Sequence, residues 1–200
     1  MEELKKTSKQ LLGEIQDKHY ADAMKAKEAG KLVAWATSIS PQELLTTMDI
    51  YTVYPENHAA AIGARKCAQP FIDYSEGKGY STDICSYARV NLAYMEIMES
   101  EAANIPKPDL IFCCNNICNT VLKWYENIAK ELEIPMIVFD LPFNHEYEIN
   151  DQNVRYIKMQ LIEAIDQLEQ ITGRKFDYDR FKEVMDISVE TSVWWKKAAM

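Results

Sequence analysis

The fold of this chain is decided by one stretch, Leu110-Ile111-Phe112-Cys113-Cys114-Asn115-Asn116-Ile117-Cys118. Its apolar first half is typical of a short buried strand, and a helical pattern starts at its end. A strand followed at once by a helix is the unit from which parallel sheets are built. Cys118 therefore falls at a helix start, where free backbone N–H groups and the helix dipole favour a thiolate.

The same alternation continues in both directions. Strands are predicted over residues 32–37, 50–54, 110–113 and 136–140. Helices are predicted over residues 8–29, 42–48, from about 58 to 71, 84–100, 117–132, 154–171 and 181–200. The pattern predicts an α/β fold: a parallel sheet of about four strands flanked by helices, flavodoxin-like or Rossmann-like, with an N-terminal helix and long C-terminal helices.

Composition restricts the classes of function. The 200 residues include 48% hydrophobic residues, as expected of a packed globular chain. The net charge is −9 and the 22 basic residues form no clustered stripe, so nucleic acid is not expected as a partner. The N-terminus lacks the apolar segment of a signal peptide, and no apolar run approaches a membrane span. We expect a cytoplasmic protein with no membrane partner.

The five cysteines are Cys67, Cys85, Cys113, Cys114 and Cys118. An odd number in a reducing compartment argues against a disulfide framework and for metal or redox chemistry. Zinc fits poorly, because no Cys-x-x-Cys pair is present. Iron–sulfur ligation fits a thiolate at a helix start better.

Each cysteine also has a structural alternative. Cys118 is interpreted as a ligand rather than a buried half-polar cysteine, and the case for Cys85 depends on it. Cys113 and Cys114 alternate along a strand, so at most one can face the ligand side. Cys67 is expected to be structural, on a helix face.

Polar and chemically active residues follow each predicted strand. Ligands bind beyond the carboxyl ends of the strands in such sheets. The residues placed there are Ser38, Glu56, the cysteines after the third strand, and Asp140 to Asn144 after the fourth. We expect these four strand ends to meet at one edge, which we call the rim. Cys85 comes from an intervening helix instead.

Glu56 and Ser38 have alternatives of comparable weight. Glu56 could accept a proton or orient a substrate, or it could simply interact with a helix dipole. Ser38 could cap the helix that Pro41 opens, but Ser40 is better placed to do so. His58 is interpreted as a satisfied turn histidine. The segment 77–79 has no phosphate-loop spacing, so any nucleotide-driven step must lie on another protein.

Several motifs in order carry a family resemblance. They are Ala34-Trp35-Ala36-Thr37-Ser38, Tyr54-Pro55-Glu56-Asn57-His58-Ala59-Ala60, Gly77-Lys78-Gly79-Tyr80-Ser81, Asp83-Ile84-Cys85-Ser86-Tyr87-Ala88-Arg89, Cys113-Cys114-Asn115-Asn116-Ile117-Cys118-Asn119 and Lys123-Trp124-Tyr125-Glu126. Over nearly the whole chain the sequence resembles the 2-hydroxyacyl-CoA dehydratases of amino-acid-fermenting anaerobes, which are related to benzoyl-CoA reductase.

The resemblance implies a heterodimer of two related subunits that receives one electron from a separate ATP-hydrolysing iron–sulfur activator protein. It implies that Cys85 and Cys118 are ligands of a [4Fe-4S] cluster, and that Ser38 and Glu56 lie beside an acyl-CoA substrate as catalytic residues. The third ligand is expected beyond residue 200. The helical pattern that runs to Met200 without a stop signal, and the uncovered Trp194 and Trp195, agree with an N-terminal half of the catalytic alpha-type subunit.

On this resemblance, residues 1–30 are a helical segment, 31–149 a cluster-binding α/β domain, and 150–200 a helical segment leading to a further half. The implied reaction removes water from an (R)-2-hydroxyacyl-CoA by a ketyl-radical mechanism, giving a 2-enoyl-CoA.

Three alternatives remain open at this point. They are a benzoyl-CoA-reductase-like subunit, a non-catalytic electron-relay subunit, and a cluster-free CoA-binding or interaction domain. Arg65, Lys66 and Arg89 could contact CoA phosphates, although surface solvation is the simpler role for each.

Overall fold

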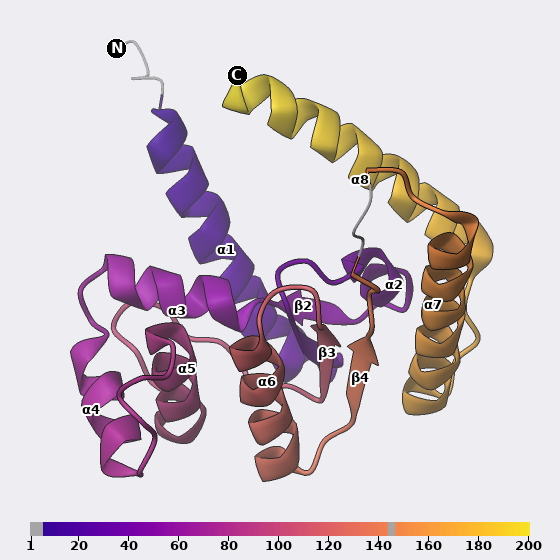
Figure 1. Ribbon diagram of the computed structural model, residues 1–200. Coiled ribbons are helices and arrows are strands. Elements are labelled where there is room, and N and C mark those ends of the chain that lie inside the picture. The colour runs from indigo at the N-terminus through magenta and orange to yellow at the C-terminus, as the bar shows by residue number, and fades with distance from the viewer. Residues whose placement is uncertain (1–5, 144–146) are drawn as a thin grey trace, which may run out of the picture.

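A four-stranded, entirely parallel sheet forms the centre of the computed structural model, which describes residues 6–143 and 147–200. Its strands are β1 (Val33–Ala36), β2 (Tyr51–Val53), β3 (Leu110–Cys114) and β4 (Met136–Phe139), in the spatial order β2-β1-β3-β4. Figure 1 shows helices on both faces of this sheet. The predicted α/β fold class is confirmed.

The side chains of the strands divide the interior into two cores. Trp35 of β1 and Ile111 of β3 face one core, whereas Ala34 and Phe112 face the other. This is the alternation expected of adjacent strand residues. Every residue of β1 and β3 is buried, because both strands lie in the middle of the sheet with helices above and below.

The helices are divided between the two faces. On the Trp35 side lie α1 (Ser8–Glu28), α3 (Pro55–Ala64), α4 (Gln69–Gly77), α5 (Ser86–Ile97) and α6 (Asn119–Leu132). On the Ala34 side lie α2 (Gln42–Thr47), α7 (Asp151–Thr172) and α8 (Tyr178–Ala199).

Local signals explain where the long helices begin and end. Thr7 and Gln10 form a reciprocal capping box at the start of α1, and the Asn150 side chain accepts a hydrogen bond from the Asn153 N–H at the start of α7. Gly173 ends α7 with a positive φ of 66°, a conformation that glycine adopts without steric cost.

One predicted helix was wrong. The structure divides the alanine-rich helix expected up to about residue 71 into α3 and α4. Between them the chain turns at Lys66, whose φ is +61°, and Pro70 then favours a new helix start. Cys67 therefore lies in this turn and not on a helix face. It is half-buried against the core and its thiol contacts the Arg65 carbonyl oxygen at 3.3 Å, which agrees with a structural role.

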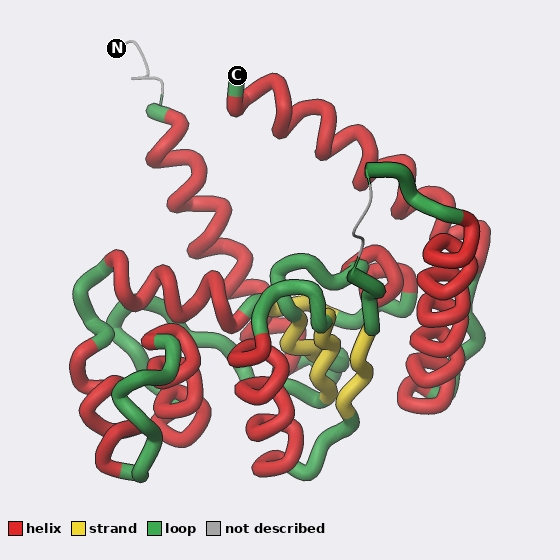
Figure 2. The backbone as a smooth tube through the Cα atoms, viewed as in Figure 1, coloured by secondary structure: helices red, strands yellow, loops and turns green. Residues whose placement is uncertain are grey.

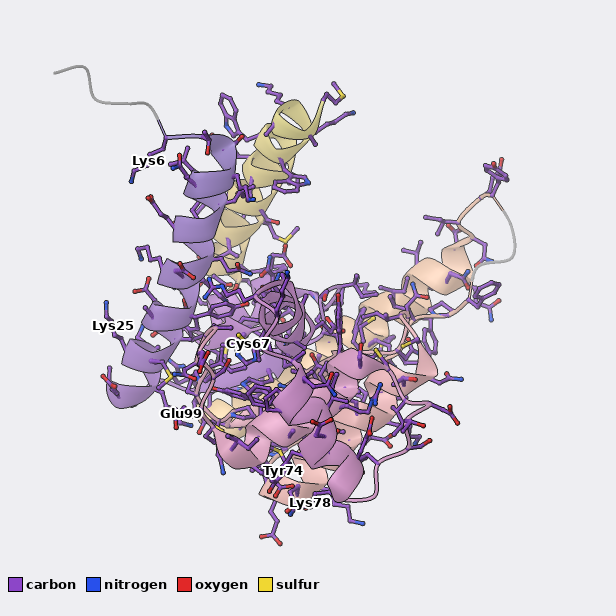
Figure 3. All side chains as sticks on the ribbon, turned by 90° about the vertical axis from the view of Figure 1, so that its left-hand side faces the viewer. Lys6, Lys25, Cys67, Tyr74, Lys78 and Glu99 are labelled. Atoms are coloured by element: carbon purple, nitrogen blue, oxygen red, sulfur yellow. The ribbon has the colours of Figure 1, made fainter. Side chains whose placement is uncertain are left out.

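Two helical arms extend past the body of the molecule. The N-terminal part of α1 and the C-terminal part of α8 project on the side toward which the strands point (Figures 1 and 3). The apolar side chains on both arms are exposed, and the exposed fractions of Trp194 and Trp195 are 60% and 66%. Within the described residues, none of the helices combines the length and hydrophobicity that a bilayer crossing requires.

His58 is part of the core and does not lie in an open turn. It is fully buried in α3, its Nε2 lies 2.9 Å from the Ala103 carbonyl oxygen, and its ring packs edge-on against Tyr94 at a centroid distance of 4.5 Å. Its Nδ1 is buried and has no partner among the described residues. Burial lowers the pKa of His58 to about 4, although the bond to Ala103 opposes this shift. It is therefore a neutral core histidine at pH 7, bonded through Nε2 alone, and not the satisfied turn histidine that was predicted.

The depressed pKa of His58 predicts a loss of stability in mild acid. The unfolded chain binds a proton near pH 6.5 and the folded chain only near pH 4, so protonation favours unfolding as the pH falls between these values. Between pH 7 and pH 5 the free energy of unfolding should decrease by about 2 kcal/mol through this residue alone. Urea unfolding of the wild type and of His58→Gln at both pH values measures it. The difference between the two proteins should change with pH, and a constant difference would contradict the assignment.

Candidate functional site

The candidate site is the rim, the edge where the four parallel strands end. Because all strands point the same way, the segments following β1, β2, β3 and β4 emerge together there. Figure 2 shows these loops gathered beyond the strand ends. Ser38, Glu56, Cys118 and Asp140 each follow one of these strands. The sequence also placed Asn144 here, but Asn144 lies outside the described residues.

Ser38 and Glu56 form a direct pair at the rim. The Ser38 backbone N–H donates to Glu56 Oε2 at 2.7 Å, and the Ser38 hydroxyl donates to the same oxygen. Glu56 lies in the first turn of α3, which Pro55 opens. The pairing follows from the sheet, because β1 and β2 are hydrogen-bonded neighbours and their exits lie side by side.

The second carboxylate oxygen of Glu56 has no partner. Glu56 Oε1 is buried, and no described group donates a hydrogen bond to it. A buried carboxylate oxygen without a donor is unfavourable, so such an atom in a folded protein calls for an explanation. The arrangement suits a carboxylate that accepts a hydrogen bond or a proton from a group that enters the site.

Ser40 does not cap α2, and that prediction was wrong. Pro41 occupies the N-cap position and no side chain caps the helix. The Ser40 hydroxyl instead donates to the Phe112 carbonyl oxygen at 3.1 Å, while Thr37 Oγ1 accepts the Cys114 N–H at 2.9 Å. These bonds fasten the exit of β1 to the exit of β3. Ser38 nevertheless has no capping role, as expected.

Cys85 and Cys118 occupy equivalent places on two adjacent helices. Cys85 is the N-cap residue of α5 and Cys118 that of α6, both are exposed, and neither side chain caps its helix. The helices are joined by a bond of 2.8 Å from Trp124 Nε1 to Asn91 Oδ1. A cavity of about 300 Å³ between them is lined by residues 84 and 119, the immediate neighbours of the two cysteines. The N-termini of both helices thus border the same inter-helix region, and each cysteine lies next to free helix N–H groups.

The other cysteines have different surroundings. Cys113 and Cys114 are both fully buried, and burial is the main cause that raises the pKa of both thiols, to about 12 for Cys113. They are inert protonated thiols at neutral pH. Among the described residues, no three Cys, His, Asp or Glu side chains come close enough together to hold a metal ion. Neither Cys85 nor Cys118 therefore belongs to such a group within the described residues.

Two of the basic residues considered for CoA phosphates are engaged elsewhere. Arg89 forms an ion pair with Glu76 that joins α5 to α4, and its side chain is largely buried. Arg65 pairs with Asp17 and also donates to the Ala102 carbonyl oxygen. Both side chains hold helices together and are not free for a ligand.

Sequence reasoning missed one participant at the rim. Tyr156, in the second turn of α7, donates its hydroxyl to Asp140. In the sequence, Tyr156 is simply a tyrosine near the start of a predicted helix. Nothing in that position indicates that its hydroxyl contacts the residue after a strand.

Comparison with known proteins gives a consistent result. A family model described as "2-hydroxyglutaryl-CoA dehydratase, D-component" matches residues 37–200. The chain is 50% identical to the (R)-phenyllactyl-CoA dehydratase alpha subunit of Clostridium sporogenes, over 97% of this chain and 48% of that protein. It is 48% identical to the (R)-2-hydroxyisocaproyl-CoA dehydratase alpha subunit of Clostridioides difficile, over 96% and 47%. It is 48% identical to the lactoyl-CoA dehydratase subunit alpha of Anaerotignum propionicum, over 96% and 49%.

The chain spans about half the length of these curated relatives. The family model covers most of the chain, including both exposed cysteines and the Ser38–Glu56 pair. This chain belongs to the 2-hydroxyacyl-CoA dehydratase family.

Proposed function

We propose that this chain is part of the catalytic alpha-type subunit of a 2-hydroxyacyl-CoA dehydratase, a lyase of amino-acid fermentation that converts an (R)-2-hydroxyacyl-CoA into a 2-enoyl-CoA. The observation that carries this proposal is the Ser38–Glu56 pair, with its buried and unpartnered carboxylate oxygen, at the same sheet edge as Cys118. The relatives named as alpha subunits of such dehydratases support the assignment.

The difficulty of the reaction lies in the proton that must leave. The departing hydroxyl is on the carbon next to the thioester, and the proton to be removed is on the following, unactivated carbon. A protein carboxylate is too weak a base for such a proton. We propose that the family's ketyl-radical route overcomes this. One electron added to the thioester carbonyl lets hydroxide leave from the neighbouring carbon and makes the proton on the following carbon acidic, and the electron is returned when the 2-enoyl-CoA forms.

The two exposed thiols fit the role of iron–sulfur ligands. Cys85 and Cys118 each lie where a helix N-terminus stabilises a thiolate, and neither sulfur is used in capping. We propose that they hold a [4Fe-4S] cluster together with a third thiolate from the rest of the subunit. When bound, this cluster supplies the electron and a Lewis-acidic iron. A related second subunit and an ATP-hydrolysing activator complete the proposed enzyme.

Ser38 and Glu56 then orient the substrate and move its proton. Glu56 Oε2 is held by two donors from Ser38, which fixes the direction in which Oε1 points. Oε1 can accept a hydrogen bond from the substrate and take up or return a proton. The lone pairs of the Ser38 hydroxyl can accept a hydrogen bond from the substrate. This division of roles favours a catalytic subunit over an electron relay, since a relay needs no substrate contacts.

Replacing Glu56 with Gln tests the catalytic role. Loss of the acid–base group should lower kcat by about 100-fold or more, with the absorbance of the cluster unchanged. The assay is anaerobic turnover of the two-subunit enzyme with activator, ATP and reductant, against a panel of 2-hydroxyacyl-CoA esters. Glu99→Gln is the matched control, because Glu99 is an exposed acid just past the far end of α5 from Cys85 (Figure 3). Near-normal turnover of Glu56→Gln would remove Glu56 from the mechanism.

Replacing Cys118 with Ala tests the ligand role. In the complete subunit, anaerobic reconstitution of Cys118→Ala should give a large loss of bound iron and sulfide, because one of three thiolate ligands is missing. Cys67→Ala is the control, since Cys67 is half-buried in a turn and should leave the iron content unchanged. Equal iron and sulfide in Cys118→Ala and the wild type would contradict the assignment.

A further inference from the structure

The rim contains two carboxylates in opposite situations. Glu56 leaves one oxygen without a partner. Asp140 has both oxygens occupied: the side-chain amide of Asn115 donates to Oδ1 and the hydroxyl of Tyr156 donates to Oδ2. A carboxylate with a donor on each oxygen is poorly suited to receive a substrate proton, and well suited to hold its neighbours in place.

These bonds belong to a network that joins two strand exits to a helix. The backbone N–H of Asn115 donates to the Phe139 carbonyl oxygen at 3.2 Å, and its side-chain Oδ1 accepts the Leu141 N–H at 2.9 Å. The Asp140 N–H donates to Gln160 Oε1 at 3.3 Å, from the same side of α7 as Tyr156. Asn115 is thus hydrogen-bonded to the segment at the end of β4 through its backbone N–H and through both the nitrogen and the oxygen of its side-chain amide.

Asn115 is also the first residue of the segment that carries Cys118. Residues 115–118 connect β3 to α6, and Cys118 has an extended backbone with φ −155° and ψ 160°. Within the described structure, the side chains of Asn116, Ile117 and Cys118 are exposed and make no hydrogen bond. Asn115 is therefore the residue whose side chain fixes this short segment. Its amide is bonded to Asp140, which is in turn bonded to Tyr156.

We infer that Asn115, Asp140 and Tyr156 are positioning residues, which set where the Cys118 thiol stands relative to Cys85. This inference rests on the proposed function, in which both thiols hold a cluster. The hydrogen bond to Asp140 raises the pKa of Tyr156, so its hydroxyl remains a donor at neutral pH. The bond from Tyr156 of α7 to Asp140 restrains the segment after β4 while that segment stays at the surface.

Thiol reactivity in the metal-free chain is the first measurement. Asn115→Leu removes both side-chain bonds without adding charge, and Tyr156→Phe removes one hydroxyl from an exposed ring. The rate of alkylation of Cys118 by iodoacetamide, followed by peptide mass spectrometry, should increase by about threefold to tenfold in Asn115→Leu, the range expected when one or two hydrogen bonds that hold the segment are lost. Tyr156→Phe should give a smaller change in the same direction. Cys85 should keep its wild-type rate in both.

Tyr147→Phe is the matched control. Tyr147 lies on the same connection between β4 and α7, is fully exposed, and its hydroxyl has no partner among the described residues. Its variant should alkylate at the wild-type rates. The complete, reconstituted subunit gives the second measurement: Tyr156→Phe should retain the wild-type iron content but show a shifted electron paramagnetic resonance spectrum and faster iron release to a chelator.

The outcomes are distinguishable. Unchanged alkylation of Cys118 in both variants, or equal acceleration at Cys118 and Cys85, would overturn the inference, because a general loosening affects both thiols alike. If Asn115→Leu fails to fold, Tyr156→Phe decides alone. A wild-type subunit that binds no iron would contradict the proposed function, while the alkylation rates would still decide whether the network positions Cys118.

Discussion

The parallel hydrogen-bonded pairing of β1 with β3 is the constraint on which the rest of this structure depends. Ala34 pairs with Leu110 and Ala36 with Phe112 in the middle of the sheet. The pairing continues past the strands, since the Thr37 N–H donates to the Phe112 carbonyl oxygen at 3.1 Å. A slip of one residue would turn every side chain of β1 to the opposite face and carry Ser38 away from Glu56. The register of two short strands thus fixes the geometry of the site.

The sequence predicted those parts of the fold that depend on local patterns. Apolar runs located all four strands, and the helix start at Cys118 follows from the change in periodicity after it. Cys85 was predicted inside a helix over residues 84–100, whereas it is the N-cap residue of α5. The turn at Lys66 has no local signal of the kind that glycine gives, but Pro70 inside the predicted helix was a signal of a new helix start that the prediction did not use. The contacts at the rim depend on strand order and register, which a single sequence does not contain. Ser38 meets Glu56 only because β2 lies beside β1.

The polar side chains at the rim differ in how completely they are hydrogen-bonded. Thr37, Ser40, Asn115 and Asp140 each make the hydrogen bonds that their side chains offer, and they hold strand exits together. Glu56 is held by Ser38 on one oxygen and left unsatisfied on the other. Unpartnered buried atoms also occur on the structural residues His58 and Arg89, so it is the position of Glu56 at the rim, together with its free oxygen, that supports the proposed role.

The arms of α1 and α8 bear on how such a site can work. Ser38, Cys85 and Cys118 are all exposed in this chain, whereas the proposed radical and proton-transfer chemistry requires water to be excluded. Both arms extend beyond the same edge of the sheet as the rim (Figure 1), and their apolar side chains are exposed. Apolar surface of this extent on a folded domain normally marks an interface. In the proposed enzyme, a second subunit that packs between the arms would cover Trp194 and Trp195 of α8 and exclude water from the rim in the same step.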